Sequence, residues 1–312
     1  MSDRLLIGVI NDQLKNVTIG IPVFNDENHI EETVRSAADQ CGRLIISDNC
    51  STDSTFIICK KLIHEFSNIE LIEQKENIGA LNNFIFLLDH AQSEYFMWLG
   101  SHDILDKNYV TTLVNRLTKE PNATLAYATP VNIDKHGAKI SEYSYFFSDE
   151  LASHSAADRV YSIIKNLYDC SLIHGVFRLD KLKPCWIHAD YIGGDHVLLA
   201  NLAMAGKFIY EKNIKYFRRY VHENDSKSAQ LRRIVGESDK SDVSYDQMQI
   251  GQFEIAKKVS IQKSIPLFFV IKSYFWIVKR FGVFDQKNNL FMDKILFKCS
   301  IYYVYFINRF FR

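Results

Sequence analysis

Three clusters of polar residues follow short apolar segments in the first third of the chain. They occupy residues 25–28, 47–53 and 100–103. Their carboxylates, amides and hydroxyls are groups that accept hydrogen bonds from a ligand or bind a divalent cation. A fourth cluster, at 193–196, places Asp195 after two glycines, which suits a carboxylate presented into a cleft as a general base.

The segments between these clusters have the pattern of an alternating α/β protein. Strand-type runs are followed by stretches in which apolar residues such as Ile30, Val34 and Ala37 recur at helical spacing. We therefore predict a mostly parallel sheet with helices on both faces. Ligands bind beyond the carboxyl ends of such strands, where the first three clusters fall, so we expect one site. The predicted strands are 17–24, 44–46, 69–72 and 95–99, and the predicted helices are 29–40, 55–66, 78–91, 158–168 and 196–204.

Composition and charge describe an ordinary globular protein. The 312 residues include 37 basic and 37 acidic side chains, a balance that gives no reason to expect a nucleic-acid partner. None of the six cysteines lies in a C-x-x-C pair, which favours a reduced, intracellular protein. No signal peptide is visible, and no uncharged apolar run approaches the ~20 residues of a membrane span. We expect a cytoplasmic location.

The glycine-rich signatures of nucleotide sites are absent from the sequence. No G-x-G-x-x-G follows the first predicted strand, and no G-x-x-x-x-G-K-[ST] occurs anywhere. The usual dinucleotide and P-loop interpretations therefore lose their main support. What remains is an α/β ligand site built from side chains.

Five segments, spread over about residues 17–225, carry a resemblance to a known family. They are Pro22-Val-Phe-Asn25, Ser47-Asp-Asn-Cys-Ser-Thr-Asp53, Asn77-Ile-Gly79, Trp98-Leu-Gly-Ser-His-Asp103 and Gly193-Gly-Asp-His196. In order and spacing they resemble family 2 glycosyltransferases. The resemblance implies a GT-A fold for residues 17–225 and a site for a nucleoside-diphosphate sugar. The residues that it places at this nucleotide-sugar site are Pro22, Phe24, Asn25, Asp48, Asn49, Asn77, Gly79, Ser101, His174 and Gly175.

Several of these positions also have a purely structural interpretation. Pro22 and Phe24 would otherwise pack at a strand edge, and Asp53 would cap the helix that follows it. Asn49 stands where the family usually has a second acid, which weakens any argument for uridine in particular.

Asp195 is the residue that the resemblance implies as the catalytic base. Inverting transfer needs a carboxylate to take the proton from the acceptor hydroxyl while that oxygen attacks the sugar. The alternative is that Asp195 caps the helix predicted over 196–204.

The family's metal motif is altered in this chain. The usual Asp-x-Asp aligns with Gly100, Ser101 and His102, followed by Asp103. Imidazole binds Mn²⁺, whereas Mg²⁺ prefers oxygen. The resemblance implies a divalent cation, Mn²⁺ or Mg²⁺, held by His102, Asp103 and His222. In the alternative, His102 only donates hydrogen bonds to phosphate and His222 is a surface residue.

The remainder, residues 226–312, is predicted to be a helical extension rich in aromatic and basic residues. Its last part, 264–312, has fifteen aromatic residues, eight Lys or Arg and two Asp or Glu. Interfacial helices combine these groups, so we expect peripheral contact with the inner face of the cell membrane. The alternative is a helical subdomain that packs its aromatic residues onto the catalytic core.

The expected activity is transfer of a sugar, with inversion, from a nucleotide-sugar donor to a hydroxyl of a lipid-linked glycan. Bacterial surface polysaccharide such as O-antigen, lipopolysaccharide or capsule is the product that the resemblance implies. One alternative is a non-catalytic nucleotide-sugar-binding module, which the missing acid at Gly100 makes conceivable. The other is a sugar nucleotidylyltransferase, although the turn after the first strand lacks the glycine-rich basic loop of those enzymes.

Overall fold

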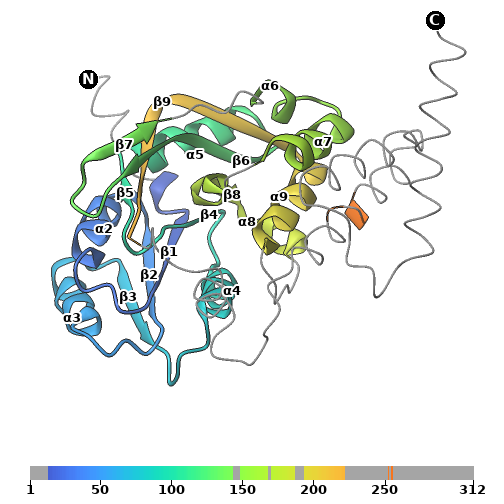
Figure 1. Ribbon diagram of the computed structural model, residues 1–312. Helices are drawn as coiled ribbons and strands as arrows, with labels where there is room; N and C mark the ends of the chain where they lie inside the picture. Colours follow the sequence, from blue (N-terminus) through green and yellow to red (C-terminus); the bar gives the residue numbers. More distant parts are fainter. Residues whose placement is uncertain are drawn as a thin grey trace, which may run out of the picture.

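The computed structural model describes residues 13–142, 148–167, 170–186, 193–221, 252, 254 and 255, and it has one nine-stranded sheet at its centre (Figure 1). Eight strands lie in the order β3-β2-β1-β4-β8-β6-β9-β5, and β7 pairs with β6. The strands are β1 (Val17–Val23), β2 (Arg43–Asp48), β3 (Ile69–Glu73), β4 (Tyr95–Trp98), β5 (Ile104–Leu105), β6 (Ala123–Ile133), β7 (Lys139–Glu142), β8 (Val176–Arg178) and β9 (Lys207–Arg219).

Helices connect and cover these strands. The α-helices are α2 (Ile30–Ala37), α3 (Thr55–Glu65), α4 (Ala80–His90), α5 (Tyr109–Lys119), α6 (Ser148–Leu151), α7 (Ala156–Asn166), α8 (Leu179–Leu182) and α9 (Gly194–Ala205). Three 3₁₀ turns are η1 (Ala38–Gln40), η2 (Ser171–His174) and η3 (Lys183–Cys185). The strand–helix alternation predicted for the first hundred residues is confirmed, and the predicted 29–40 helix is divided between α2 and η1.

The first four strands form the parallel half of the sheet. β1 pairs in parallel with β2 and with β4, and β2 pairs in parallel with β3. Because side chains alternate along a strand, Ile19 and Ile21 of β1 enter the core shared with α2 and α5. On the other face, a Cβ at Gly20 would lie 3.0 Å from the Leu87 Cβ, so glycine lets α4 pack closely against β1.

The second half of the sheet is mixed. β8 is antiparallel to both β4 and β6, β6 is parallel to β9, and β5 is antiparallel to β9. β9 therefore runs beside β6 and also reaches β5, which directly follows the third polar cluster. This topology carries the end of β9 to the predicted site from more than a hundred residues away.

The helices α7 and α9 pack on the face of the sheet that holds the larger aromatic core. Arg159 of α7 is buried and donates to the carbonyls of Ala203 (2.7 Å) and Ser153 (2.7 Å). A guanidinium at the carboxyl end of α9 satisfies carbonyls that the helix itself leaves unpaired. This contact fixes α9, whose opposite end carries Asp195.

The predicted extension 226–312 lies outside the described residues apart from positions 252, 254 and 255. No helix in the part of the chain that the structure describes has the length and apolar character needed to cross a bilayer.

Candidate active site

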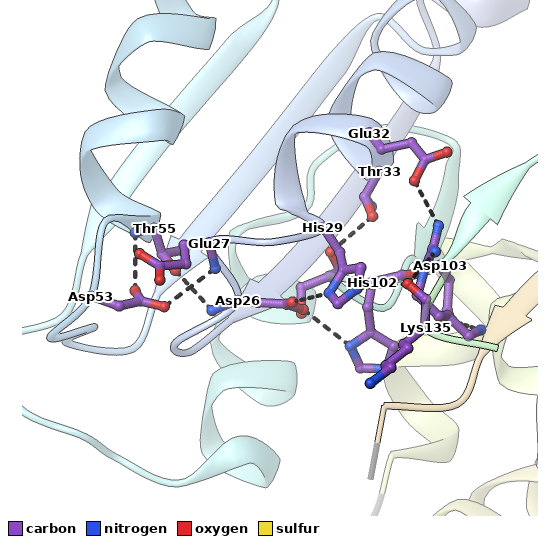
Figure 2. Close-up of polar contacts among 12 residues, drawn as sticks. Asp26, Glu27, His29, Glu32, Thr33, Asp53, Thr55, His102, Asp103 and Lys135 are labelled. Carbon is purple, nitrogen blue, oxygen red and sulfur yellow. Dashed lines mark hydrogen bonds and ion pairs between the residues drawn. The ribbon is translucent and has the colours of Figure 1, made fainter. Parts of the chain in front are cut away.

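The loops after β1 and β2 interlock at the carboxyl edge of the sheet. The Asn25 backbone N–H donates to the Ser51 hydroxyl (2.9 Å), and the Asn25 side chain accepts from the Thr52 N–H (2.8 Å). The Asp53 carboxylate accepts from the N–H groups of Glu27 (3.2 Å) and Thr55 (3.0 Å), as Figure 2 shows. Asn25 and Asp53 therefore hold two loops together. The capping alternative for Asp53 is wrong in detail, because Asp53 bonds to the first N–H of α3 from the residue before the N-cap, which is Ser54.

Asp48 ends β2 beside the end of β1, because it pairs in register with Val23. Its side chain is fully buried, and one oxygen accepts from the Ser51 N–H at 2.9 Å. Within the described residues, the other oxygen, Oδ1, has no hydrogen-bond partner. Phe24 directly follows Val23, and it is 42% exposed. A buried acceptor and an exposed ring at adjacent strand ends suit the edge and the face of a nucleobase.

A hydrogen-bonded pair of amides lines the next turn. The Asn49 side chain donates to Asn77 (2.8 Å) and accepts from the Ile78 N–H (2.9 Å). Gly79 follows with φ of 81°, a conformation that favours glycine. The structure thus brings the predicted residues Asn49, Asn77 and Gly79 together beside Asp48.

Asp26 is the centre of a cluster that sequence reasoning missed (Figure 2). Its Oδ2 accepts from the Ser101 hydroxyl (2.6 Å) and contacts His102 Nδ1 (3.1 Å), while Oδ1 contacts His29 Nδ1 (2.8 Å). Burial opposes the charge on Asp26, but the hydrogen bonds from His102, Ser101 and His29 outweigh it and lower the pKa to about 2. Burial also opposes charge on His102, yet its hydrogen bond to Asp26 and the nearby carboxylates raise its pKa.

Asp103 has a different environment from its neighbour His102. Its side chain is 3% exposed, and its carboxylate accepts from the Tyr216 hydroxyl and from the Arg219 N–H (2.8 Å). Both oxygens therefore attach the loop 100–103 to β9. A Cβ at Gly100 would collide with Asp103 Oδ2, so glycine at this position fits the conformation in which Asp103 bonds to β9.

Arg219 holds the same loop from the end of β9. Its buried guanidinium donates to the His102 carbonyl (2.9 Å), the Lys135 carbonyl (3.1 Å) and the Glu32 carboxylate (2.6 Å). One planar side chain thus joins α2, the loop 100–103 and the turn between β6 and β7.

His174 and Gly175 connect the sheet to η2. His174 Nδ1 contacts the Trp98 carbonyl (3.1 Å), and the imidazole stacks on the Tyr216 ring at a centroid distance of 4.7 Å. A Cβ at Gly175 would collide with the Ala126 carbonyl, so this glycine is required for packing against β6. Through Tyr216, His174 is linked to Asp103.

Asp195 lies in the first turn of α9, whose N-cap is Gly193 with φ of 85°. The capping alternative is wrong in detail, because the Asp195 carboxylate accepts from the His196 N–H at 2.9 Å and does not occupy the cap position. Ligand atoms of Asp195, His196 and Cys170 all lie within 4.8 Å of one another. Cys170, which lies close to Asp195, is the N-cap of η2, and His174 is the last residue of η2. This 3₁₀ turn therefore connects the neighbourhood of Asp195 to the loops around Asp103.

The described residues contain one group of three side chains with ligand atoms close enough to share a metal, and it is Cys170, Asp195 and His196. The predicted pair His102 and Asp103 is not part of such a group, and His222 lies outside the described residues. Sulfur and imidazole ligands suit zinc better than Mg²⁺. At His102, additional ligands would have to come from Asp26, from water or from the diphosphate itself.

The sequence matches a known family over the part of the chain that carries the loops 25–28, 47–53 and 100–103. Residues 18–175, just over half of the chain, match the family described as Glycosyl transferase family 2. Glycosyltransferase GlyA of Streptococcus pneumoniae is 27% identical over 159 residues, 49% of this chain and 22% of GlyA. The putative teichuronic acid biosynthesis glycosyltransferase TuaG of Bacillus subtilis is 34% identical over 90 residues, 28% of this chain and 36% of TuaG. The chain therefore spans only about a fifth to a third of these relatives.

Solved structures show the same fold at low sequence identity. S. aureus TarS, residues 1–349, has a TM-score of 0.59 and 13% identity, covering 91% of this chain and 78% of that chain. The mannosyltransferase PcManGT from Pyrobaculum calidifontis, in complex with GDP-Man and Mn²⁺, has a TM-score of 0.52 and 12% identity, covering 87% and 76%. The predicted GT-A-like fold is confirmed by these likenesses.

We expect Asp26→Asn to lower the free energy of unfolding by about 2 kcal/mol near neutral pH. The pKa of Asp26 is about 2 in the folded protein, against an ordinary 3.8. Its contribution is therefore present above about pH 4 and is lost as the pH falls toward 2. Urea unfolding at several pH values should show the gap between wild type and variant closing over this range.

Asp39→Asn is the matched control for this measurement, because Asp39 is an exposed acid in η1, directly after α2. It should change the free energy of unfolding by less than about 0.5 kcal/mol. A gap between wild type and Asp26→Asn that stays constant down to about pH 2 would contradict the ion-pair role of Asp26.

Proposed function

Since the chain belongs to glycosyl transferase family 2, we propose that it transfers a sugar from a nucleoside-diphosphate sugar to a glycan hydroxyl with inversion. The observation that carries this proposal is the edge formed by β1, β2 and β4. There a buried acceptor oxygen of Asp48 and an exposed Phe24 ring lie beside the Asp26–His102 cluster. TarS, which shares the fold, is known in complex with UDP-GlcNAc and with UDP.

The nucleoside half of the donor is assigned to the ends of β1 and β2. Asp48 Oδ1 would accept a hydrogen bond from the base or ribose, which removes the cost of burying that oxygen without a partner. Phe24 and Pro22 would pack against the ring. Asn77 and Gly79 would shape the turn beside the ribose and the sugar.

The diphosphate half is assigned to the Asp26–His102 cluster. Asp26 remains ionised at neutral pH because its pKa is about 2. Its side chain is 11% exposed and that of His102 is 27% exposed, so a ligand can reach both. A carboxylate and an imidazole at this position fit a divalent cation such as Mn²⁺, which would supply positive charge to the departing diphosphate. Asp26 takes the carboxylate role here in place of Asp103, whose oxygens are bonded to β9.

Asp195 is assigned as the general base. As the acceptor oxygen forms its bond to the sugar C1, the bond from C1 to the diphosphate oxygen breaks, and the acceptor proton passes to the Asp195 carboxylate. The connection from Asp195 through Cys170 and η2 to His174 supports a location across the site from the loop 100–103.

Asp195→Asn is expected to lower kcat by about 10²–10⁴-fold with little change in donor binding. A panel of nucleotide sugars screened by thermal shift would first identify a donor that stabilises the wild type. Transfer and donor binding are then measured for both proteins. Asp180→Asn, which removes an exposed acid from α8, is the control and should match the wild type. Equal transfer by Asp195→Asn and the wild type would exclude this base.

Removal of divalent cations is expected to abolish transfer, and Mn²⁺ should restore it better than Mg²⁺. The reason is that His102 offers nitrogen, which Mg²⁺ accepts poorly. His102→Asp should reverse the preference toward Mg²⁺ because it restores an oxygen ligand. The measurement is transfer rate against metal concentration after chelation. Activity that survives a strong chelator unchanged would contradict a catalytic cation at this position.

We propose a cytoplasmic enzyme that meets a lipid-linked acceptor at the membrane surface through residues 264–312. The support is the composition of that segment, with fifteen aromatic residues and a positive charge surplus of six, since eight basic less two acidic residues leaves six. The relative TuaG is named as a putative teichuronic acid biosynthesis glycosyltransferase. This is consistent with a cell-surface glycan as product.

Replacing Lys272, Lys279 and Arg280 by Gln in the full chain should weaken binding to anionic vesicles by about 10²-fold. Each basic group near an anionic surface contributes about 1 kcal/mol. Co-sedimentation with vesicles of phosphatidylglycerol and phosphatidylcholine measures the change. The control replaces Lys60, Lys61 and Lys119, three exposed lysines of α3 and α5. Equal loss in both triple variants would argue against a specific role for the extension.

A further inference from the structure

The turn between β6 and β7, residues 134–137, is held rigidly against the Asp26–His102 cluster. The Lys135 carbonyl accepts from Arg219 Nη1 (3.1 Å) and contacts His29 Nε2 (3.3 Å). Within the turn, the Asp134 carboxylate accepts from the N–H groups of His136 (2.8 Å) and Ala138 (2.9 Å). The backbone of Lys135 is therefore fixed both from inside the turn and from two distant elements.

Both residues that hold Lys135 also contact the cluster. His29 bonds to Asp26, and Arg219 bonds to the His102 carbonyl. Figure 2 shows Lys135 among these residues, with its side chain extending on the side of the cluster where the His102 ring lies. The turn is therefore attached to the groups that the proposed function places at the diphosphate.

The Lys135 ammonium is free to meet an anion. The residue is exposed, and in the described ranges no acidic side chain forms an ion pair with it. Two neighbouring lysines differ, because Lys139 and Lys215 both pair with Glu142. Arg218 adds a second cation close enough to His102 to act on it electrostatically. Glycine at position 100 also leaves the loop 100–103 with one acid fewer than the family's motif.

We infer that Lys135 is a diphosphate contact of the donor site, where its ammonium binds the nucleoside diphosphate and stabilises it as the leaving group. This inference rests on the proposed function. An ammonium at a diphosphate oxygen contributes charge where negative charge develops as the bond to the sugar breaks. Here the turn supplies that charge from outside the loop 100–103, and Arg219 sets its position.

The test compares Lys135→Met and Lys135→Arg with Lys139→Met, a control that removes the same charge from the same hairpin. The probes are UDP, GDP, ADP and dTDP, and the one that binds the wild type most tightly is paired with its nucleoside. Lys135→Met should weaken diphosphate binding about tenfold, as expected for a lost hydrogen bond to a charged group. Its affinity for the nucleoside should not change.

Lys135→Arg should remain within about threefold of the wild type, and Lys139→Met should match it, because neither removes a cation from the diphosphate. Calorimetry gives each dissociation constant, and the thermal unfolding midpoint shows that exposed substitutions leave the fold intact. Diphosphate binding by Lys135→Met equal to wild type, or an equal loss for the nucleoside, would overturn the inference alone. Failure of all four diphosphates to bind the wild type would overturn the proposed function as well.

Discussion

The buried carboxylate of Asp103 determines how the rest of the site is built. It accepts from the Tyr216 hydroxyl and the Arg219 N–H, and these bonds attach the loop 100–103 to the strand β9. A buried carboxylate without such donors would cost several kcal/mol, so the loop conformation and the position of β9 depend on each other. The space that Asp103 occupies leaves no room for a side chain at Gly100. Glycine at position 100, where the resemblance places the first acid of the metal motif, is compatible with this contact.

A second carboxylate of the site lies on a different loop, after β1. Asp26, which follows β1, accepts a hydrogen bond from the Ser101 hydroxyl and contacts the His102 ring. Three donors around one carboxylate lower its pKa to about 2, so Asp26 is ionised at neutral pH. The site thus keeps a carboxylate beside His102 and gains a lysine-bearing turn at its margin. The charges of this site therefore differ from those of the Asp-x-Asp motif that the resemblance aligns with residues 100–102.

The sequence allowed the parallel half of the fold to be predicted because its signals are local. The predicted strands 17–24 and 44–46 are present as β1 (Val17–Val23) and β2 (Arg43–Asp48). The rule that ligands bind at the carboxyl ends of parallel strands then brought Asp48 and Asn77 to one site. Asp26 was missed because its partners His102 and Ser101 are more than seventy residues away. An acid two residues beyond the first strand, in a chain that lacks one at position 100, was the only signal available.

Long-range contacts also explain why single residues were assigned only in part. The sequence predicted that Asn25 contacts the ligand, whereas its side chain accepts from the Thr52 N–H and joins the loop after β1 to the loop after β2. Gly175 is required by the Ala126 carbonyl on a neighbouring strand, which no local pattern reveals. Asp195 presents the reverse case, since the capping role that its position suggests belongs to Gly193. With Arg159 fixing the far end of α9, the Asp195 carboxylate, which accepts from the His196 N–H, is held at a defined place, as the proposed proton transfer requires.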